Sequence, residues 1–111
     1  MNSKAKGTRG ENELREYLTA AGYPAHRNDQ RYEGGYNKPD ITAQGLEHLH
    51  IECKRVEKLN ITDAMQQAQR DAAGRTPVVI HRKNRAEWLI TMRLMDYLGM
   101  IRRDINARQD I

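Results

Sequence analysis

The 111-residue sequence has no phenylalanine, one tryptophan and one cysteine. A single cysteine cannot form an internal disulfide, which is typical of a reducing compartment and predicts a cytoplasmic, intracellular protein. No apolar run approaches the roughly 20 residues that a membrane helix needs, and the charged N-terminus lacks the apolar core of a signal peptide. We therefore expect no contact with a membrane.

The amino-acid composition as a whole is polar and basic. Hydrophobic residues make up 38% and charged residues 31%, and the formal net charge is +4. A basic balance points towards a polyanionic partner, and two groups of cations suit contact with a phosphate backbone, although each could equally be a solvated surface. These groups are Lys4, Lys6 and Arg9 near the N-terminus and Arg82, Lys83 and Arg85 within one turn.

The length suits one domain with a single core. We expect a flexible basic arm over 1–9, one domain over 10–101 and a C-terminal tail over 102–111. Hydrophobic periodicity and turn residues then predict a helix, three strands, a helix, two strands and a helix, which is an α/β fold with a mixed central sheet flanked by helices. The predicted helices cover 10–21, the segment between Asn60 and Gly74, and 92–101; the predicted strands cover 23–28, 40–43, 48–54, 78–82 and 86–91.

Apolar residues at helical spacing predict the buried face of the first and last helices. In the first helix, Glu11 lies on the predicted stripe, one turn before its apolar part. A carboxylate there is either a helix N-terminal acid or part of a site over the sheet. The predicted inward residues are Leu14, Tyr17, Leu18 and Ala21 in the first helix, and Leu94, Tyr97, Leu98 and Ile101 in the last.

The most informative stretch is Pro39-Asp40 followed by the run from His48 to Lys54. Proline suits a strand entry, which places Asp40 at the start of a strand. The second run alternates polar and apolar residues as a half-buried strand does, so Glu52 and Lys54 share one face roughly 6.6 Å apart. Taken alone, this pair could be a solvated cross-strand ion pair.

Two carboxylates and an amine close together suggest phosphodiester hydrolysis. Hard oxygen donors suit Mg²⁺, which proteins usually hold with one or two carboxylates and waters. A lysine beside such an ion can orient a water and balance the charge of a phosphate.

Glu11, Pro39-Asp40 and Glu52-Cys53-Lys54 together resemble the PD-(D/E)xK nuclease superfamily. The likeness extends to archaeal-type Holliday junction resolvases and small phage nucleases, through Lys6-Gly7, Gly22-Tyr23 and Arg27. It covers the first half of the chain most closely, and the loop between Arg27 and Asp40 is longer here than in the archaeal enzymes.

The resemblance implies a role for each matching residue. Asp40, Glu52 and the backbone carbonyl of Cys53 would hold Mg²⁺ or Mn²⁺, and Lys54 would position the attacking water. Glu11 would hold a water or a second ion, and Gln67, rather than Gln69, would assist from the second helix. The resemblance also implies that Arg27 contacts DNA, together with the two basic groups. Tyr32 and Tyr36, in the loop that contains Gly34-Gly35, could stack on bases or sugars, or they could simply hold this loop in place.

Several alternatives remain open for the function. A zinc site from His48, His50 and Cys53 would require ligands from opposite faces of one strand, and both histidines are expected at the surface. An inward Cys53 and a lone serine, Ser3, argue against a nucleophilic enzyme. A general DNA nuclease and a non-catalytic nucleic-acid-binding module stay as alternatives to a junction resolvase.

A resolvase must cut two strands symmetrically, which a two-fold homodimer does most easily. The chain would then act on branched or four-way-junction DNA, in the host cytoplasm if a phage encodes it. Candidate interface residues lie in the C-terminal third, and each is equally explained as core: Trp88, Met92, Met95 and Met100.

Overall fold

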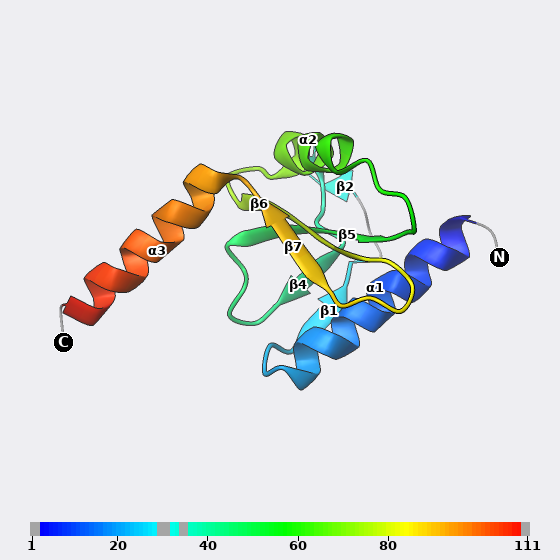
Figure 1. Cartoon of the computed structure of the whole chain (residues 1–111), viewed down its shortest axis with the longest axis horizontal. Coiled ribbons are helices and arrows are strands. Elements are labelled where there is room, and N and C mark those ends of the chain that lie inside the picture. The colour runs from blue at the N-terminus through cyan, green and yellow to red at the C-terminus, as the bar shows by residue number, and fades with distance from the viewer. Residues whose placement is uncertain (1–2, 29–31, 34–35, 110–111) are drawn as a thin grey trace.

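The computed structural model describes residues 3–28, 32–33 and 36–109, with side chains described over 7–28 and 38–109. A five-stranded sheet lies between two helices, and a third helix extends from one end (Figure 1). The chain runs α1 (Ser3–Ala20), β1 (Ala25–Arg27), β2 (Tyr32–Glu33), β3 (Tyr36–Asn37), β4 (Ile41–Ala43), β5 (Leu49–Arg55), α2 (Ile61–Asp71), β6 (Thr76–Arg82), β7 (Leu89–Met92) and α3 (Leu94–Gln109).

The sheet is mixed, as the sequence predicts, with strand order β1-β4-β5-β6-β7. Among the described strand pairs, only β5 and β6 are parallel, and α2 makes the crossover between them. Among the described residues, the ladder between β4 and β5 has a single register pair, Ile41 with Ile51, so the second half of β5 has no described ladder partner on the β4 side. The predicted α/β class is confirmed, and β2 and β3 form a separate two-stranded hairpin.

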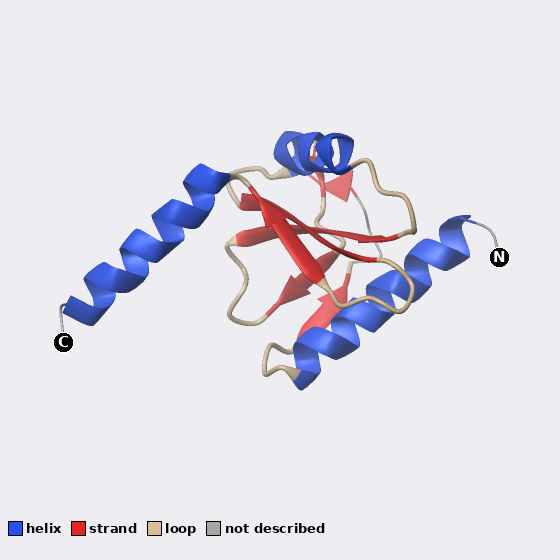
Figure 2. Ribbon diagram, in the orientation of Figure 1, coloured by secondary structure: helices blue, strands red, loops and turns tan. Residues whose placement is uncertain are grey.

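Both faces of the central strands are covered, because alternate side chains meet different helices. On one face Leu14 of α1 packs with Ile51 and Val78, and on the other face Val79 packs with Ala64 and Ala68 of α2. The prediction that β5 is only half-buried is therefore wrong. Its polar face lies under α2, because Glu52 is the register partner of Val79, which packs against α2; Figure 2 shows α2 over this side of the sheet.

Helix α1 begins at Ser3, so the flexible arm predicted for 1–9 is wrong for residues 3–9. The helix passes close to β5 at Gly10, where a Cβ atom would lie 2.7 Å from the Cβ of Arg55. Leu14 is buried and Leu18 packs against the same core, as predicted. Tyr17 and Ala21 are exposed instead, because the sheet covers only the middle of this long helix.

Helix α3 differs most from expectation. The prediction of an inward face is wrong: none of its residues is buried, and the four residues expected inside are 40–70% exposed. It continues to Gln109, so most of the predicted 102–111 tail is helical. No helix in the described part of the chain has the length and apolar character needed to cross a bilayer.

Candidate active site

A pocket of about 410 Å³ opens beside the second half of the central strand β5, where β4 no longer pairs with it. The five residues predicted to be catalytic all line it, and they come from four different segments of the chain. Gly7, Cys53, Arg55 and Val56 complete the lining. The predicted set is thus brought together: Glu11, Asp40, Glu52, Lys54 and Gln67.

Asp40 stands just before β4, in line with the edge of β5. Its backbone N–H donates to the carbonyl of Ile51 at 2.8 Å, and its Oδ2 accepts from the N–H of Cys53, also at 2.8 Å. The carboxylate therefore takes the place of the missing β4 partner. Because the N–H and C=O of one strand residue point to the same side, the carbonyl of Cys53 faces the Asp40 edge too.

Asn28 fixes the Pro39-Asp40 segment, a role that the sequence analysis missed. Its backbone N–H donates to the carbonyl of Asp40 at 3.1 Å, and its side-chain Nδ2 donates to the carbonyl of Pro39 at 2.7 Å. The same Nδ2 lies 2.8 Å from Oγ1 of Thr42. No sequence signal marks this asparagine, because its partners lie more than ten residues away along the chain.

Glu52 is held from its own strand. Nε2 of His50 lies 2.8 Å from Oε1 of Glu52, and the two side chains are only 1% and 4% exposed. The expectation that His50 is a surface residue is wrong, because α2 covers this face; His48 is exposed as predicted. A carboxylate only accepts, so the Nε2–H of His50 donates this hydrogen bond.

Glu11 approaches the pocket from α1 and pairs with Arg27 of β1. Nε of Arg27 lies 3.1 Å from Oε1 of Glu11, and the Glu11 side chain is 6% exposed. Because α1 begins at Ser3, Glu11 lies in the middle of the helix and is a buried, partnered group, so the alternative of a helix N-terminal acid is wrong. Arg27, predicted to grip a phosphate, has its Nε committed to Glu11 and orients that carboxylate.

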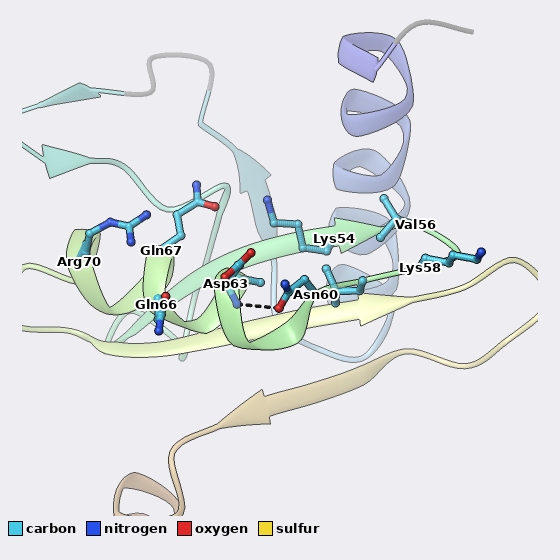
Figure 3. A pocket seen from close by; sticks show the side chains of 10 residues that line it. Lys54, Val56, Lys58, Asn60, Asp63, Gln66, Gln67 and Arg70 are labelled. Carbon is cyan, nitrogen blue, oxygen red and sulfur yellow. Dashed lines mark hydrogen bonds between the residues drawn. The ribbon is translucent and has the colours of Figure 1, made fainter.

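Lys54 and Gln67 project to the same side of β5 (Figure 3). Both also line an adjoining groove of about 540 Å³ that runs beside α2 and contains Lys58 and Arg70. Among the described residues, no acidic side chain forms an ion pair with these three cations. Asp63 is the acidic side chain in this lining, so with three cations the groove carries a net positive charge up to the edge of the carboxylate pocket.

Glu13 ties α1 to the ends of β5 and β6. Its Oε2 accepts from Nε of Arg55 at 2.7 Å and from Nη2 of Arg82 at 3.0 Å. Burial acts to raise the pKa of this carboxyl, but the two arginines outweigh it and lower the pKa below its usual value. Arg82 also lies 5.4 Å from the ring centroid of Trp88. Arg82 therefore makes its contacts within the fold, whereas the sequence predicted that it would contact a DNA phosphate.

The other predicted DNA contacts are dispersed. Arg9 is exposed on α1, and Lys83 and Arg85 are exposed in the turn after β6. The backbone of Lys4 and Lys6 is in α1, and that of Tyr32 and Tyr36 is in β2 and β3. The side chains of these four residues, and the Gly34-Gly35 loop tip, lie outside the described part.

The donors in the pocket fit a hard divalent cation. In the described part of the chain, no three His, Cys, Asp or Glu side chains lie close enough together to hold a metal ion by themselves, which excludes the zinc alternative there and applies equally to the trio Glu11, Asp40 and Glu52. Asp40 and Glu52, with the Cys53 carbonyl beside them, are oxygen donors of the kind that Mg²⁺ takes together with several waters. Burial, together with the charges of Asp40 and Glu11, raises the pKa of the Cys53 thiol, which argues against a cysteine nucleophile.

Comparisons with known proteins agree with this geometry. A family model described as "Phage putative PDDEXK endonuclease" matches residues 2–109. Among solved structures, the chain is similar to Hjc of Archaeoglobus fulgidus, a Holliday junction resolvase from an archaeal hyperthermophile. The identity is 29% and the TM-score 0.60, over 78% of this chain and 76% of that chain. A comparison with curated protein sequences found no significant match.

Proposed function

The chain belongs to the phage PD-(D/E)xK endonuclease family, and on that premise we propose that it is a metal-dependent DNA endonuclease that resolves four-way junctions. One observation carries the proposal. Two carboxylates positioned by the backbone and by His50 share a pocket with Lys54, and a cationic groove leads into that pocket. Buried acidic groups beside a cationic groove are suited to a cation and a phosphodiester together.

Each residue has a defined task in the proposed hydrolysis. Asp40, Glu52 and the carbonyl of Cys53 would hold the ion, and Glu11 would hold a water. When bound, Mg²⁺ or Mn²⁺ supplies Lewis-acid activation of a phosphoryl oxygen and of water. Lys54 donates to the attacking water or to the phosphate, with Gln67 assisting beside it.

The reaction balances as a simple hydrolysis. The water oxygen bonds to phosphorus, the ester P–O bond breaks, and the water proton passes to solvent or to the leaving oxygen. Lys54 offsets charge on the phosphoryl oxygens, which is where charge is greatest in the transition state.

The similarity to a resolvase over three quarters of both chains supports a junction as the substrate rather than DNA in general. A non-catalytic binding module would be expected to lack one of the acidic or lysine positions, and all are present in one pocket. Symmetric incision further leads us to propose a two-fold homodimer acting on DNA in the host cytoplasm. The basic residues Arg9, Lys83 and Arg85 would contact phosphates outside the pocket.

Substrate choice tests the proposal. A labelled four-way junction, a linear duplex of the same arm sequence and a single strand are incubated with the wild-type protein and Mg²⁺ or Mn²⁺. We expect the junction to be cut fastest, at paired positions near its centre. Equal cutting of all three would identify a general nuclease, and binding without cutting would identify the non-catalytic module.

A further inference from the structure

A second cleft, of about 510 Å³, lies where α3 leaves the body of the protein, at the end of the sheet where β5 and β6 begin (Figure 1). We call it the α3 cleft. Its lining shares no residue with the carboxylate pocket or with the groove beside α2, so none of it has a task in the proposed hydrolysis. The α3 cleft is lined by His48, Gly74, Arg75, Thr76, Met100 and Arg103.

The lining of the α3 cleft carries positive charge and contains no carboxylate. Among the described residues, no acidic side chain forms an ion pair with Arg75 or Arg103. Further along α3, by contrast, Arg108 pairs with Asp104 at 3.1 Å. Like charges that line one cleft repel each other, and a bound anion would offset that repulsion.

Hydrogen bonds fix the backbone from which these side chains extend. The N–H of Thr76 donates to the carbonyl of His48 at 2.8 Å and ties the starts of the two parallel strands together. The N–H of Arg75 donates to the carbonyl of Ala72 at 2.9 Å, across a turn in which Gly74 has a φ of 89°. Guanidinium groups present their donors in a fork that matches the oxygens of a phosphate.

The α3 cleft lies at a fixed distance from the site of hydrolysis. His48 directly precedes β5, and Lys54 follows it by six residues on the same strand. An extended strand of that length spans roughly 20 Å. About six base pairs of DNA cover the same length, at roughly 3.4 Å for each step along a strand. One DNA molecule can therefore reach both places, whereas a small anion could fill only one.

We propose that the α3 cleft binds a backbone phosphate of the DNA, about six base pairs from the phosphodiester that is cut, with Arg75 and Arg103 as the contacting side chains. This inference rests on the proposed function, because it requires that one DNA molecule fills the cleft and the carboxylate pocket. A phosphate contact positions the DNA without reading its sequence. It would therefore set the direction of a DNA arm relative to the active site.

The first test measures the affinity for a labelled four-way junction by fluorescence anisotropy, without a divalent ion, at salt concentrations from about 50 to 200 mM. For Arg103→Gln we expect roughly tenfold weaker binding, and a slope of log affinity against log salt that is smaller by about one. Arg102→Gln removes the same charge from the next residue, which is exposed and outside the cleft lining, and should keep the wild-type slope. Far-UV circular dichroism checks that both variants are folded.

The second test locates the contacted phosphate on the DNA. Junctions are made with one neutral methylphosphonate at successive positions along an arm, counted from the incision. At about six steps the neutral group should weaken binding by the wild type and by Arg102→Gln, and should have no further effect on Arg103→Gln. This position should lose its effect because both changes remove the same contact.

Two results would overturn the proposed contact. One is an equal loss of affinity and slope in Arg103→Gln and Arg102→Gln, which would reflect only the overall charge of the protein. The other is unchanged junction binding by Arg103→Gln together with calorimetric binding of inorganic phosphate by the wild type, which would identify a site for a free anion. If Arg103→Gln lowers the slope but the wild type cuts no junction, the proposed function is rejected and the phosphate contact is kept.

Discussion

Nε2 of His50 donates to Oε1 of Glu52 across 2.8 Å, and both side chains are enclosed under α2. The two residues are separated by one position on the same strand, so they share a face. Glu52 therefore enters the pocket with one oxygen already oriented by a neighbouring ring. This contact makes His50 a positioning residue for the acidic site.

His50→Ala should reduce junction cleavage and the affinity for Mn²⁺, each by roughly 10- to 100-fold, as is usual when the partner of a metal-binding group is lost. His50→Gln, whose amide nitrogen can occupy the place of Nε2, should recover most of both. Calorimetric titration with Mn²⁺ measures the affinity separately from the cleavage rate. Unchanged Mn²⁺ affinity in a folded His50→Ala protein would show that the contact is only structural.

Cys53 contributes its backbone and not its thiol. The raised pKa of the thiol predicts very slow reaction with an alkylating reagent at neutral pH while the protein is folded, and fast reaction after unfolding. Cys53→Ala should cut junctions at a rate within about threefold of the wild type, because the carbonyl remains in place. A loss of cleavage by 100-fold in a folded variant would assign a catalytic role to the sulfur.

The two glycines of α1 provide a matched pair for the packing of this helix on β5. Gly10→Ala would place a Cβ 2.7 Å from the Cβ of Arg55 and should cost about 1–3 kcal/mol of unfolding free energy. Gly7→Ala meets nothing within 4 Å and should stabilise the helix by up to about 1 kcal/mol. Urea unfolding of both variants measures the difference, and equal stabilisation by both would refute the close approach.

The ion pairs of Glu13 should make the stability of the fold depend on pH. Its folded-state pKa is lower than the usual 4.5, so its pairs with Arg55 and Arg82 stabilise the protein above that pH and are lost as pH falls below it. Glu13→Gln should therefore be less stable than the wild type at pH 7, and the difference should shrink towards pH 3. Thermal melts from pH 3 to 7 check this, and a pH-independent difference would contradict it.

The sequence predicted correctly that Asp40, Glu52 and Lys54 lie together, because these residues carry local signals. Pro39 marks the strand entry before Asp40, and strict alternation fixes the shared face of Glu52 and Lys54. Those signals depend only on neighbours along the chain. The order of elements was predicted from similar local signals at the ends of helices and strands. One example is Asn60, whose Oδ1 accepts from the N–H of Asp63 at the start of α2.

The contacts that hold the site could not be predicted in the same way. Alternation on β5 is that of a half-buried strand, yet α2 covers its polar face, which only the tertiary arrangement reveals. Asn28 and Glu13 likewise act on partners at least 11 residues distant in sequence. For helix α3 the sequence predicted burial and the structure shows exposure. The periodicity of the helix indicates an apolar face, but it does not indicate whether this chain or another one buries that face.

The most direct test of the acidic site is single-turnover cleavage of a labelled four-way junction by Asp40→Asn. Asp104→Asn, an exposed carboxylate on α3, is the matched control. Removal of the charge at Asp40 should slow incision by roughly 100-fold or more while junction binding persists, and the control should cut at the wild-type rate. An Asp40→Asn protein that cuts as fast as the wild type would contradict the assignment of the site.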